Sequence, residues 1–263
     1  MNGIVQFDHT LGGIGNQLFK YCAARAWAKH VGAKFEAGDW PGRRIFVGPA
    51  NDPLPSCEMP ARQAGDNGSP PPQDGESGFR LAGYCQLQRY VGLMDRAELK
   101  QHLRIKPELL ALVEPIIPHD WYAVAHLREG DFINHPLYCN ISEASYLRAC
   151  DQFGIPRARL VLVRESQPRT VAGLPPAWDG LGRDGWLPDF LLMQKARFLL
   201  RANSSFSWWS GAIGDQEAVF APVVESRVGS CDVEFVRGNW PRIAHSDRVA
   251  IQIDNLRLPG DAR

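Results

Sequence analysis

The chain has 263 residues, of which 44% are hydrophobic and 22% charged, and its 29 basic and 29 acidic side chains give a formal net charge of zero. This length suits one large domain or two small ones. The balanced charge argues against a general nucleic-acid binder, which would carry a basic excess. A net charge of zero is still compatible with a local basic pocket that binds one phosphorylated ligand.

Nothing in the sequence indicates a membrane span or a secretion signal. No apolar run approaches the length that crosses a bilayer, and the first residues, MNGIVQFD, lack a basic segment followed by a long apolar one. We therefore expect a cytoplasmic protein, associated at most peripherally with the inner membrane. Because a chain of this size does not need disulfides and shows no secretion signal, we expect reduced thiols. The absence of a CxxC pair argues against a zinc site. The six cysteines are Cys22, Cys57, Cys85, Cys139, Cys150 and Cys231.

The first half opens as a strand, a glycine loop and a helix. Apolar residues at three- and four-residue spacings after the loop predict the helix, and Gly32 supplies its end. Residues 37–78 are rich in glycine, proline and small polar residues, so we expect a long loop or insertion there. The predicted elements are a strand at 3–8, the loop at 11–16, a helix at 17–31, strands at 33–36 and 79–84, and helices at 87–103 and 107–117.

The second half alternates strands and helices more regularly, which predicts a parallel sheet covered by helices on both faces. Ser142 is the expected N-cap of one helix. Because Pro118 closes the first half, we predict an α/β fold with two Rossmann-like domains, 1–118 and 119–263, which face each other across a cleft. The predicted elements are strands at 121–127, 159–163, 199–202 and 219–221, and helices at 142–152, 189–198 and 205–213.

The glycine loop, GGIGNQ at 12–17, is the first of three polar clusters that follow predicted strands. Glycines allow the backbone to approach a ligand closely, and the start of the next helix offers free amide donors to an anion. Gly13 and Gly15, with Glu36 downstream, also match a dinucleotide fingerprint in which Leu18 replaces the third glycine. The loop therefore predicts a phosphate-facing turn, a dinucleotide site or a purely structural turn.

The second cluster, HLREGD at 126–131, ends the strand at 121–127. Ligands of open parallel sheets lie beyond the carboxyl ends of the strands, so this polar turn is a candidate site. Arg128 carries a planar, permanently charged group suited to a phosphate or a carboxylate. Asp131 could act as a base or hold an arginine, and His126 could be a structural residue or a ligand.

The third cluster, NSSFSWWSGA at 203–212, begins a predicted helix. Ser204 and Ser205 are placed to cap this helix and to share its N-terminus with a bound phosphate. Ordinary capping above two core tryptophans is the alternative. Together with Arg128, this helix start describes a pyrophosphate pocket. Because no convincing DxD-like acidic pair is present, the arginine and the helix dipole would neutralise the pyrophosphate in place of a metal.

The sequence resembles the α-1,2-fucosyltransferase family, glycosyltransferase family 11, and more distantly the protein O-fucosyltransferases. The resemblance covers nearly the whole chain apart from 37–78, and it implies a GT-B fold, a GDP-fucose donor, inversion at the transferred sugar and no metal or other cofactor. The stretches that carry it are GGIGNQLFKYCAARAWAK, GYCQLQRYVGLMDRAELKQHL, AHLREGDF, DFLLMQKARFLLRANSSFSWWSGAI and the closing FAPVV and NWPRI.

This resemblance also implies roles by position. Arg128 stands at the first arginine of the family's HxRRGD motif, expected on the donor pyrophosphate, and Asn16 stands in the GGxGNQ loop, expected to face the donor from the other domain. The family's second arginine is Glu129 here, and its FSDD-like turn is replaced by VRES at 163–166, where Glu165 alone could recognise the guanine edge. The donor-binding candidates are Gly13, Gly15, Asn16, His126, Arg128, Glu165, Ser204, Ser205 and Phe206.

These features predict an inverting glycosyltransferase that transfers fucose, or a related deoxysugar, from a GDP-sugar to a glycan hydroxyl. An α-1,2 linkage and a role in bacterial surface polysaccharide synthesis are expected, with the glycan acceptor on the side of the first domain. Arg128 would stabilise the departing diphosphate, and Asp131 is the candidate base. Two alternatives stay open: an NAD(P)-dependent oxidoreductase that uses Gly13, Gly15 and Glu36, and a non-catalytic nucleotide-sugar or glycan-binding relative.

Overall fold

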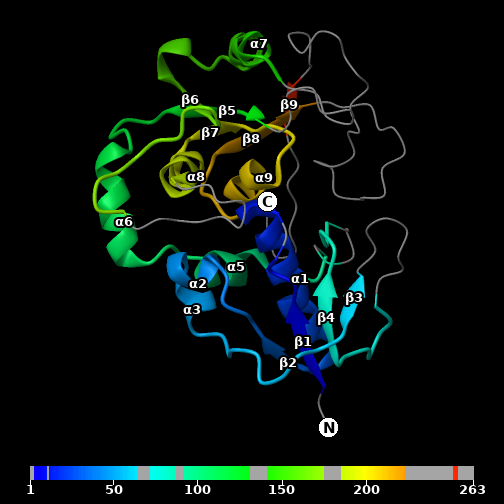
Figure 1. Cartoon of the computed structure of the whole chain (residues 1–263). Helices are drawn as coiled ribbons and strands as arrows, with labels where there is room; N and C mark the ends of the chain where they lie inside the picture. The colour runs from blue at the N-terminus through cyan, green and yellow to red at the C-terminus, as the bar shows by residue number, and fades with distance from the viewer. Residues whose placement is uncertain are drawn as a thin grey trace.

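A computed structural model of the chain describes residues 3–10, 12–63, 72–86, 90, 92–130, 141–174, 185–222 and 251–253. The described residues form two separate β-sheets with helices packed against them and between them (Figure 1). Strands from the first half of the sequence build one sheet, and strands from the second half build the other.

The first sheet has four parallel strands in the order β2-β1-β4-β3. Side chains alternate along β1: Val5 and Phe7 join the apolar core that contains helix α1 (Ile14–Val31), whereas Gln6 hydrogen-bonds to Glu36 on the neighbouring strand. This sheet therefore presents one apolar and one polar face. Its strands are β1 (Ile4–Phe7), β2 (Lys34–Glu36), β3 (Ala61–Gln63) and β4 (Phe79–Ala82).

The second sheet has the order β6-β5-β7-β8-β9, in which the first four strands are parallel and β9 is antiparallel to β8. The parallel sheet was predicted, and the antiparallel β9 was not. Because β5 lies between β6 and β7, the chain reverses its direction of winding at β5. The strands are β5 (Ala123–Leu127), β6 (Leu160–Arg164), β7 (Phe198–Leu200), β8 (Ala218–Pro222) and β9 (Ile251–Ile253).

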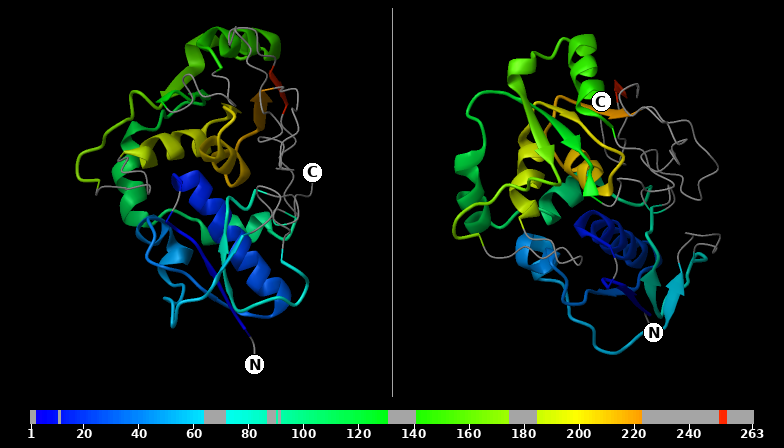
Figure 2. Two further views of the ribbon diagram at one scale, coloured as in Figure 1. Left: turned by 45° about the vertical axis from the view of Figure 1, so that its right-hand side comes forward. Right: turned by 45° about the horizontal axis from the view of Figure 1, so that its top comes forward.

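Helices cover both faces of the second sheet, as predicted (Figure 2). Helix α7 (Glu143–Phe153) packs on one face, where Tyr146 and Cys150 contact the sheet core, and α8 (Trp186–Lys195) packs on the other through Leu192 and Met193. The serine-rich stretch forms α9 (Ser205–Ala212) on the same side as α8. That side is the one that faces the first sheet.

The largest apolar core joins the two halves of the chain. Phe19 of α1 packs on Trp208 and Trp209 of α9, with ring centroids 4.6 and 5.0 Å apart. Trp186 and Phe190 of α8 belong to the same core as the first sheet. Helices α1, α8 and α9 therefore fill the space between the sheets with buried side chains, and α9 is shared by both halves.

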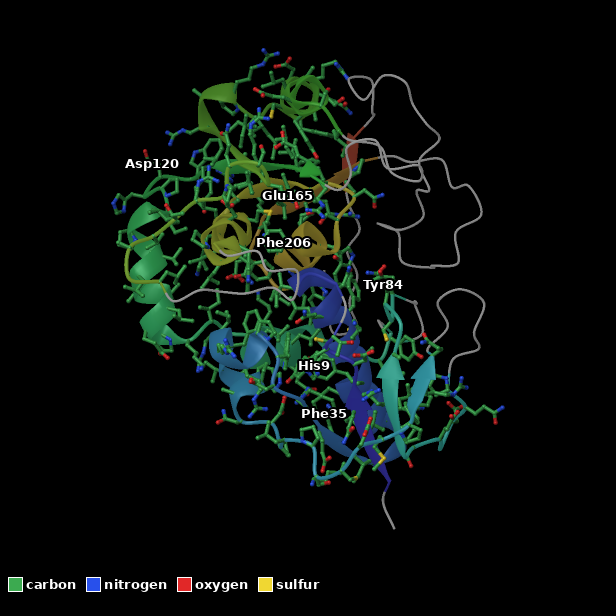
Figure 3. The ribbon with its side chains drawn as sticks, viewed as in Figure 1. His9, Phe35, Tyr84, Asp120, Glu165 and Phe206 are labelled. Atoms are coloured by element: carbon green, nitrogen blue, oxygen red, sulfur yellow. The ribbon has the colours of Figure 1, made fainter. Side chains whose placement is uncertain are left out.

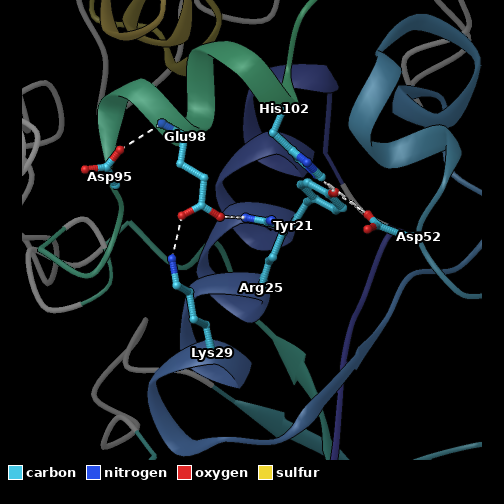
Figure 4. Close-up of polar contacts among 7 residues, drawn as sticks. All are labelled: Tyr21, Arg25, Lys29, Asp52, Asp95, Glu98 and His102. Carbon is cyan, nitrogen blue, oxygen red and sulfur yellow. Dashed lines mark hydrogen bonds and ion pairs between the residues drawn. The ribbon is translucent and has the colours of Figure 1, made fainter.

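Helix α5 (Arg96–His102) is fastened to α1 by charged side chains (Figure 4). Asp95 caps α5 by accepting a hydrogen bond from the backbone N–H of Glu98. The Glu98 carboxylate then accepts hydrogen bonds from Arg25 at 2.5 Å and Lys29 at 2.6 Å. A second group in Figure 4 joins Tyr21 to Asp52 and to His102 at the other end of α5. These contacts fix the position of α5 along α1.

Three local expectations for the first half were wrong. The segment 37–78 contains helices α2 (Gly42–Ile45) and α3 (Val47–Ala50) as well as β3, because Trp40, Ile45 and Phe46 reach the core despite the surrounding glycines and prolines. Helix α5 begins at Arg96, where Asp95 caps it, and residues 92–95 are not helical. Helix α1 begins at Ile14, so that the end of the predicted glycine loop forms the first turn of the helix.

The remaining predicted elements agree with the structure within about three residues at each end. They include α6 (Pro107–Val113) with the short 3-10 helix Glu114–Ile116, and the two helix N-caps Ser142 and Ser204. The short 3-10 helix Arg157–Arg159 was not predicted. Cys22, Cys57, Cys85 and Cys150 are free thiols, whereas Cys139 and Cys231 lie outside the described residues. In the part of the chain that the structure describes, no helix combines the length and apolarity needed to cross a membrane.

Candidate functional site

The carboxyl ends of β1 and β5 are the places where each sheet changes its direction of winding. In open α/β sheets, ligands bind beyond the carboxyl ends of the strands at such switch points. The glycine loop follows β1, and Arg128 follows β5, with the start of α9 after the neighbouring strand β7. The three polar clusters predicted from the sequence therefore occupy the positions that this fold class uses for ligands.

Gly15 brings the first and third clusters into direct contact. A Cβ atom at this position would lie 2.5 Å from the backbone nitrogen of Phe206 and 2.7 Å from the carbonyl carbon of Ser205. Only glycine permits that approach, because a side chain would push the start of α1 away from the start of α9. The glycine loop therefore packs on the serine-rich helix start, and this close contact explains why position 15 is a glycine.

Phe206 connects this contact to the second cluster. Its ring meets the His126 imidazole edge-on, with centroids 5.8 Å apart, and Figure 3 labels Phe206 between the second sheet and the start of α1. His126 is only 3% exposed, and its burial, together with the charge of Arg128, lowers the pKa of the imidazole to about 3. A neutral imidazole under Phe206 supports the packing of α9 and does not supply a positive charge for a phosphate.

Arg128 and Glu165 form an ion pair at the ends of β5 and β6, and their side chains are 15% and 16% exposed. Their sequence neighbours form a second pair with the charges exchanged between the strands: Arg164, just before Glu165, lies 3.0 Å from Glu129, just after Arg128. Ser166 also donates hydrogen bonds to Glu129 from its backbone N–H and its hydroxyl. The two donor-binding candidates Arg128 and Glu165 therefore contact each other. In each of the two ion pairs, a carboxylate neutralises the charge of one arginine.

Glu129 stands where the HxRRGD motif of the α-1,2-fucosyltransferases has its second arginine. In this structure its carboxylate binds Arg164 and Ser166. Burial opposes its ionisation, but the hydrogen bonds from Ser166 and Arg164 outweigh that cost and hold the pKa of the carboxyl below its usual value. Arg164 also reaches Glu143 at the start of α7. Glu129 thus links the end of β5 to the end of β6 beside Arg128. Unlike an arginine, it adds no positive charge there.

The start of α9 has the chemistry of an anion site. Ser204 caps the helix by accepting a hydrogen bond from the backbone N–H of Phe206 at 3.3 Å. Ser204 is buried, whereas Ser205 and Phe206 are partly exposed. Backbone N–H groups at a helix N-terminus, together with the positive end of the helix dipole, favour a negatively charged group.

The opposite end of α9 is held by the first half of the chain. Arg96 of α5 donates hydrogen bonds to the carbonyl of Ala212 at 2.9 Å and of Gly214 at 3.1 Å, and Lys100 donates to Gly214 at 3.2 Å. Cations near a helix C-terminus satisfy its last carbonyls and interact favourably with its dipole. The first half therefore fixes α9 at both ends, through Gly15 at the start and Arg96 at the end.

Asn16 lies in the first turn of α1, and a residue that the sequence analysis did not single out holds its side chain. Gln86 follows β4 and donates a hydrogen bond from Nε2 to Oδ1 of Asn16 at 3.0 Å. Gly13, directly before α1, is the N-cap residue of that helix. The sequence could have pointed to Gln86, because it is a polar residue directly after the strand predicted at 79–84.

Two further candidates have different outcomes. Asp131, the candidate base, lies outside the described residues. Glu36, which the dinucleotide alternative needs for a ribose, is fully buried and accepts hydrogen bonds from Gln6, Lys34 and the backbone and hydroxyl of Ser56. Within the described ranges, no group of three or more His, Cys, Asp or Glu side chains is arranged to hold a metal ion.

Comparison with protein-family models and with curated protein sequences gives no match. Among solved structures, the fucosyltransferase NodZ from Bradyrhizobium is similar, with a TM-score of 0.51 and 11% identity over 85% of this chain and 95% of that one. A structure of NodZ α-1,6-fucosyltransferase soaked with GDP-fucose gives a TM-score of 0.48 and 14% identity over 86% and 96%. The NodZ structure with the TM-score of 0.51 shares the fold of this chain, and the predicted GT-B-like α/β fold class is confirmed.

Proposed function

We propose that this protein is an inverting glycosyltransferase that transfers fucose, or a related deoxysugar, from a GDP-linked donor to a glycan hydroxyl. The contact of Gly15 with the backbone of Ser205 and Phe206 carries the proposal. It unites the two most specific motifs of the sequence, the glycine loop and the serine-rich helix start, on a fold that a fucosyltransferase shares. The resemblance of both motifs to the α-1,2-fucosyltransferases gives the reaction class.

Transfer from a sugar diphosphate requires stabilisation of the negative charge that develops on the leaving group. The start of α9 offers backbone N–H groups, and Arg128 offers a guanidinium group at the end of β5. These groups would act on the diphosphate without a metal ion. The second half of the chain would then bind the donor, and the first half would bind the acceptor.

The acceptor hydroxyl must lose a proton during the transfer, which calls for a general base. Asp131 is our candidate, three residues beyond Arg128 in the sequence. The family resemblance favours an α-1,2 linkage and a glycan of the bacterial surface as the acceptor. A cytoplasmic location with peripheral membrane association would suit that role.

A thermal-shift panel of GDP, UDP, CMP and NADP tests the donor class, since a ligand that binds only the folded state raises its melting temperature. We expect stabilisation by GDP alone. Stabilisation by NADP without GDP would favour the oxidoreductase alternative, although the enclosed position of Glu36 argues against it. Stabilisation by none of the four would contradict the proposal.

The variant Arg128→Ala tests the site itself. Loss of a key charge-stabilising donor lowers turnover by about two to four orders of magnitude. Arg157→Ala is the control, because Arg157 pairs with Asp151 on the exposed surface of the second half. Near-normal transfer by a folded Arg128→Ala protein would exclude Arg128 from the reaction. If the natural protein binds GDP but neither hydrolyses the donor nor transfers its sugar to any glycan of a broad panel, a non-catalytic binding protein would be favoured.

A further inference from the structure

Asn16 and Gln86 form a hydrogen bond across 70 residues of sequence at the ligand-facing edge of the first sheet. Nε2 of Gln86 lies 3.0 Å from Oδ1 of Asn16. Asn16 is in the first turn of α1, next to Gly15, whose backbone packs on the start of α9. Gln86 is itself only 7% exposed, so it is enclosed by protein and not by solvent.

The chemistry of an amide gives this hydrogen bond a direction. A side-chain amide has a carbonyl oxygen that accepts hydrogen bonds and an NH₂ group that donates two. Since Gln86 donates to the oxygen of Asn16, the acceptor end of Asn16 is turned toward Gln86. Its NH₂ group lies beside the glycine loop, since a Cβ atom at Gly12 would come within 3.0 Å of Nδ2, and from there it can donate to the oxygens of an anion.

The turn that carries Gln86 has an unusual backbone. Among the described residues, the preceding Cys85 is the one non-glycine residue with a positive φ, at 56°, and Gly83 has a φ of 94°. A side chain in this region costs roughly 1–2 kcal/mol, and such conformations persist where the surrounding structure enforces them, often at functional sites. Here the conformation coincides with a buried Cys85 and a buried Gln86 that reaches back to α1.

We infer that Gln86 is a positioning residue for the proposed donor site. It fixes the amide of Asn16 so that the NH₂ group donates to the diphosphate of the nucleotide-sugar, opposite the start of α9. This inference rests on the proposed function, and it adds a residue of the first half whose effect on the donor passes entirely through Asn16. Gln86 itself touches no ligand.

A double-mutant cycle on GDP affinity tests the inference, using the full chain and isothermal titration calorimetry. Asn16→Ala removes the donor group, and Gln86→Leu removes the hydrogen bond at similar size in a buried place. We expect Asn16→Ala to weaken GDP binding about tenfold and Gln86→Leu about threefold to tenfold. The double variant should bind no more weakly than Asn16→Ala, because residues that act through one group are not additive. Gln6→Leu, another buried glutamine of the first sheet, is the control and should bind GDP normally.

A third variant, Gln86→Glu, reverses the polarity of the hydrogen bond. A carboxylate only accepts, so Asn16 must turn its NH₂ group toward it and present its oxygen to the anion. GDP affinity should fall at least as far as in Asn16→Ala. Additive losses in the cycle, normal binding by Asn16→Ala, or normal binding by a folded Gln86→Glu protein would each overturn the inference and leave the proposed function standing. Failure of the natural protein to bind GDP would overturn both.

Discussion

The carboxylate of Glu165 lies against the guanidinium group of Arg128, although the sequence assigns these two residues to different parts of one ligand. Arg128 was expected on the diphosphate and Glu165 on the guanine edge. In the structure they neutralise each other, and His126 beside them is uncharged at neutral pH because its pKa is about 3. A diphosphate that approaches Arg128 must therefore compete with Glu165 for the same group.

This competition predicts that Glu165→Gln strengthens the binding of inorganic pyrophosphate, which carries no base. Removing the carboxylate charge removes this competitor for Arg128, and we expect a gain of roughly threefold to tenfold, equivalent to about 1 kcal/mol. Glu129→Gln is the matched control, because it removes the same charge from the pair with Arg164 and leaves Arg128 paired. Calorimetric titration of both variants measures the difference. Equal gains in the two variants, or a loss in Glu165→Gln, would show that Glu165 does not compete at Arg128.

The approach of the two helix starts predicts a steric effect of Gly15→Ala. Alanine would ordinarily favour a helix over glycine by about 1 kcal/mol. Here its Cβ would meet the backbone of Ser205 and Phe206, and forcing atoms into a packed region costs typically 1–3 kcal/mol. We expect a lower melting temperature together with weaker GDP binding, because the start of α9 must shift.

Gly32→Ala separates the steric effect from the general cost of replacing a glycine. Gly32 ends α1 with a φ of 67°, and a Cβ there would meet nothing within 4 Å. Its replacement should cost about 1 kcal/mol through the backbone conformation alone. GDP affinity should stay normal in Gly32→Ala. Equal GDP affinities in the two variants would mean that the contact at Gly15 has no part in ligand binding.

Much of this architecture can be read from the sequence because local signals and tertiary packing agree. The alternation of strands and helices predicted the second sheet, and the caps Ser142 and Ser204 marked helix starts that the structure contains. Because the glycine loop and the serine-rich stretch each directly follow a predicted strand, the sequence also predicted their position at strand ends. These features depend on patterns within a few residues of one another.

The relationships across the molecule could not be predicted in the same way. The pairing of Arg128 with Glu165 depends on which strand lies next to β5, and the role of Gln86 depends on a turn with a positive φ at Cys85. Trp40 and Phe46 are isolated apolar residues in a stretch of glycine and proline, so their burial follows from contacts distant in sequence. Propensity carries no information about such contacts, because they are decided by tertiary packing.

The shared core predicts that the two halves unfold together. Trp208 and Trp209 pack on α1, and Arg96 holds the last carbonyls of α9, so neither half keeps its core when the other unfolds. We expect one calorimetric transition, whose van't Hoff and calorimetric enthalpies agree. Two resolved transitions would contradict a shared core.

Removing the hold on the end of α9 should lower the stability of the whole protein. Arg96→Ala removes the donor to the Ala212 carbonyl, whereas Gly214 keeps its hydrogen bond from Lys100, and the expected cost is about 1–3 kcal/mol. A loss of this size lowers the melting temperature by roughly 2–4 °C per kcal/mol in a protein near this size. Arg157→Ala removes a surface ion pair and should change stability by less than about 1 kcal/mol. Equal shifts in both variants would mean that Arg96 contributes no more than an ordinary surface charge.

The enclosed carboxylate of Glu36 predicts how stability depends on pH. Burial raises its pKa, but hydrogen bonds from Lys34, Ser56 and Gln6 outweigh burial and lower the pKa from an ordinary 4.5 to about 2. Because the folded pKa lies below the unfolded one, the unfolded chain binds more protons between these values, and stability falls as the pH drops from about 4.5 to 2. The contribution of Glu36 is fully present above pH 4.5.

Denaturant unfolding at a series of pH values measures this contribution. The natural protein should lose at most about 3 kcal/mol through Glu36 across that window. Glu36→Gln should be less stable at neutral pH and should show a shallower loss in acid, since the titrating group is gone. Glu58→Gln is the control, because Glu58 lies on the exposed surface opposite Arg80. An acid limb that is equally steep in Glu36→Gln and in the natural protein would show that Glu36 does not titrate with a lowered pKa.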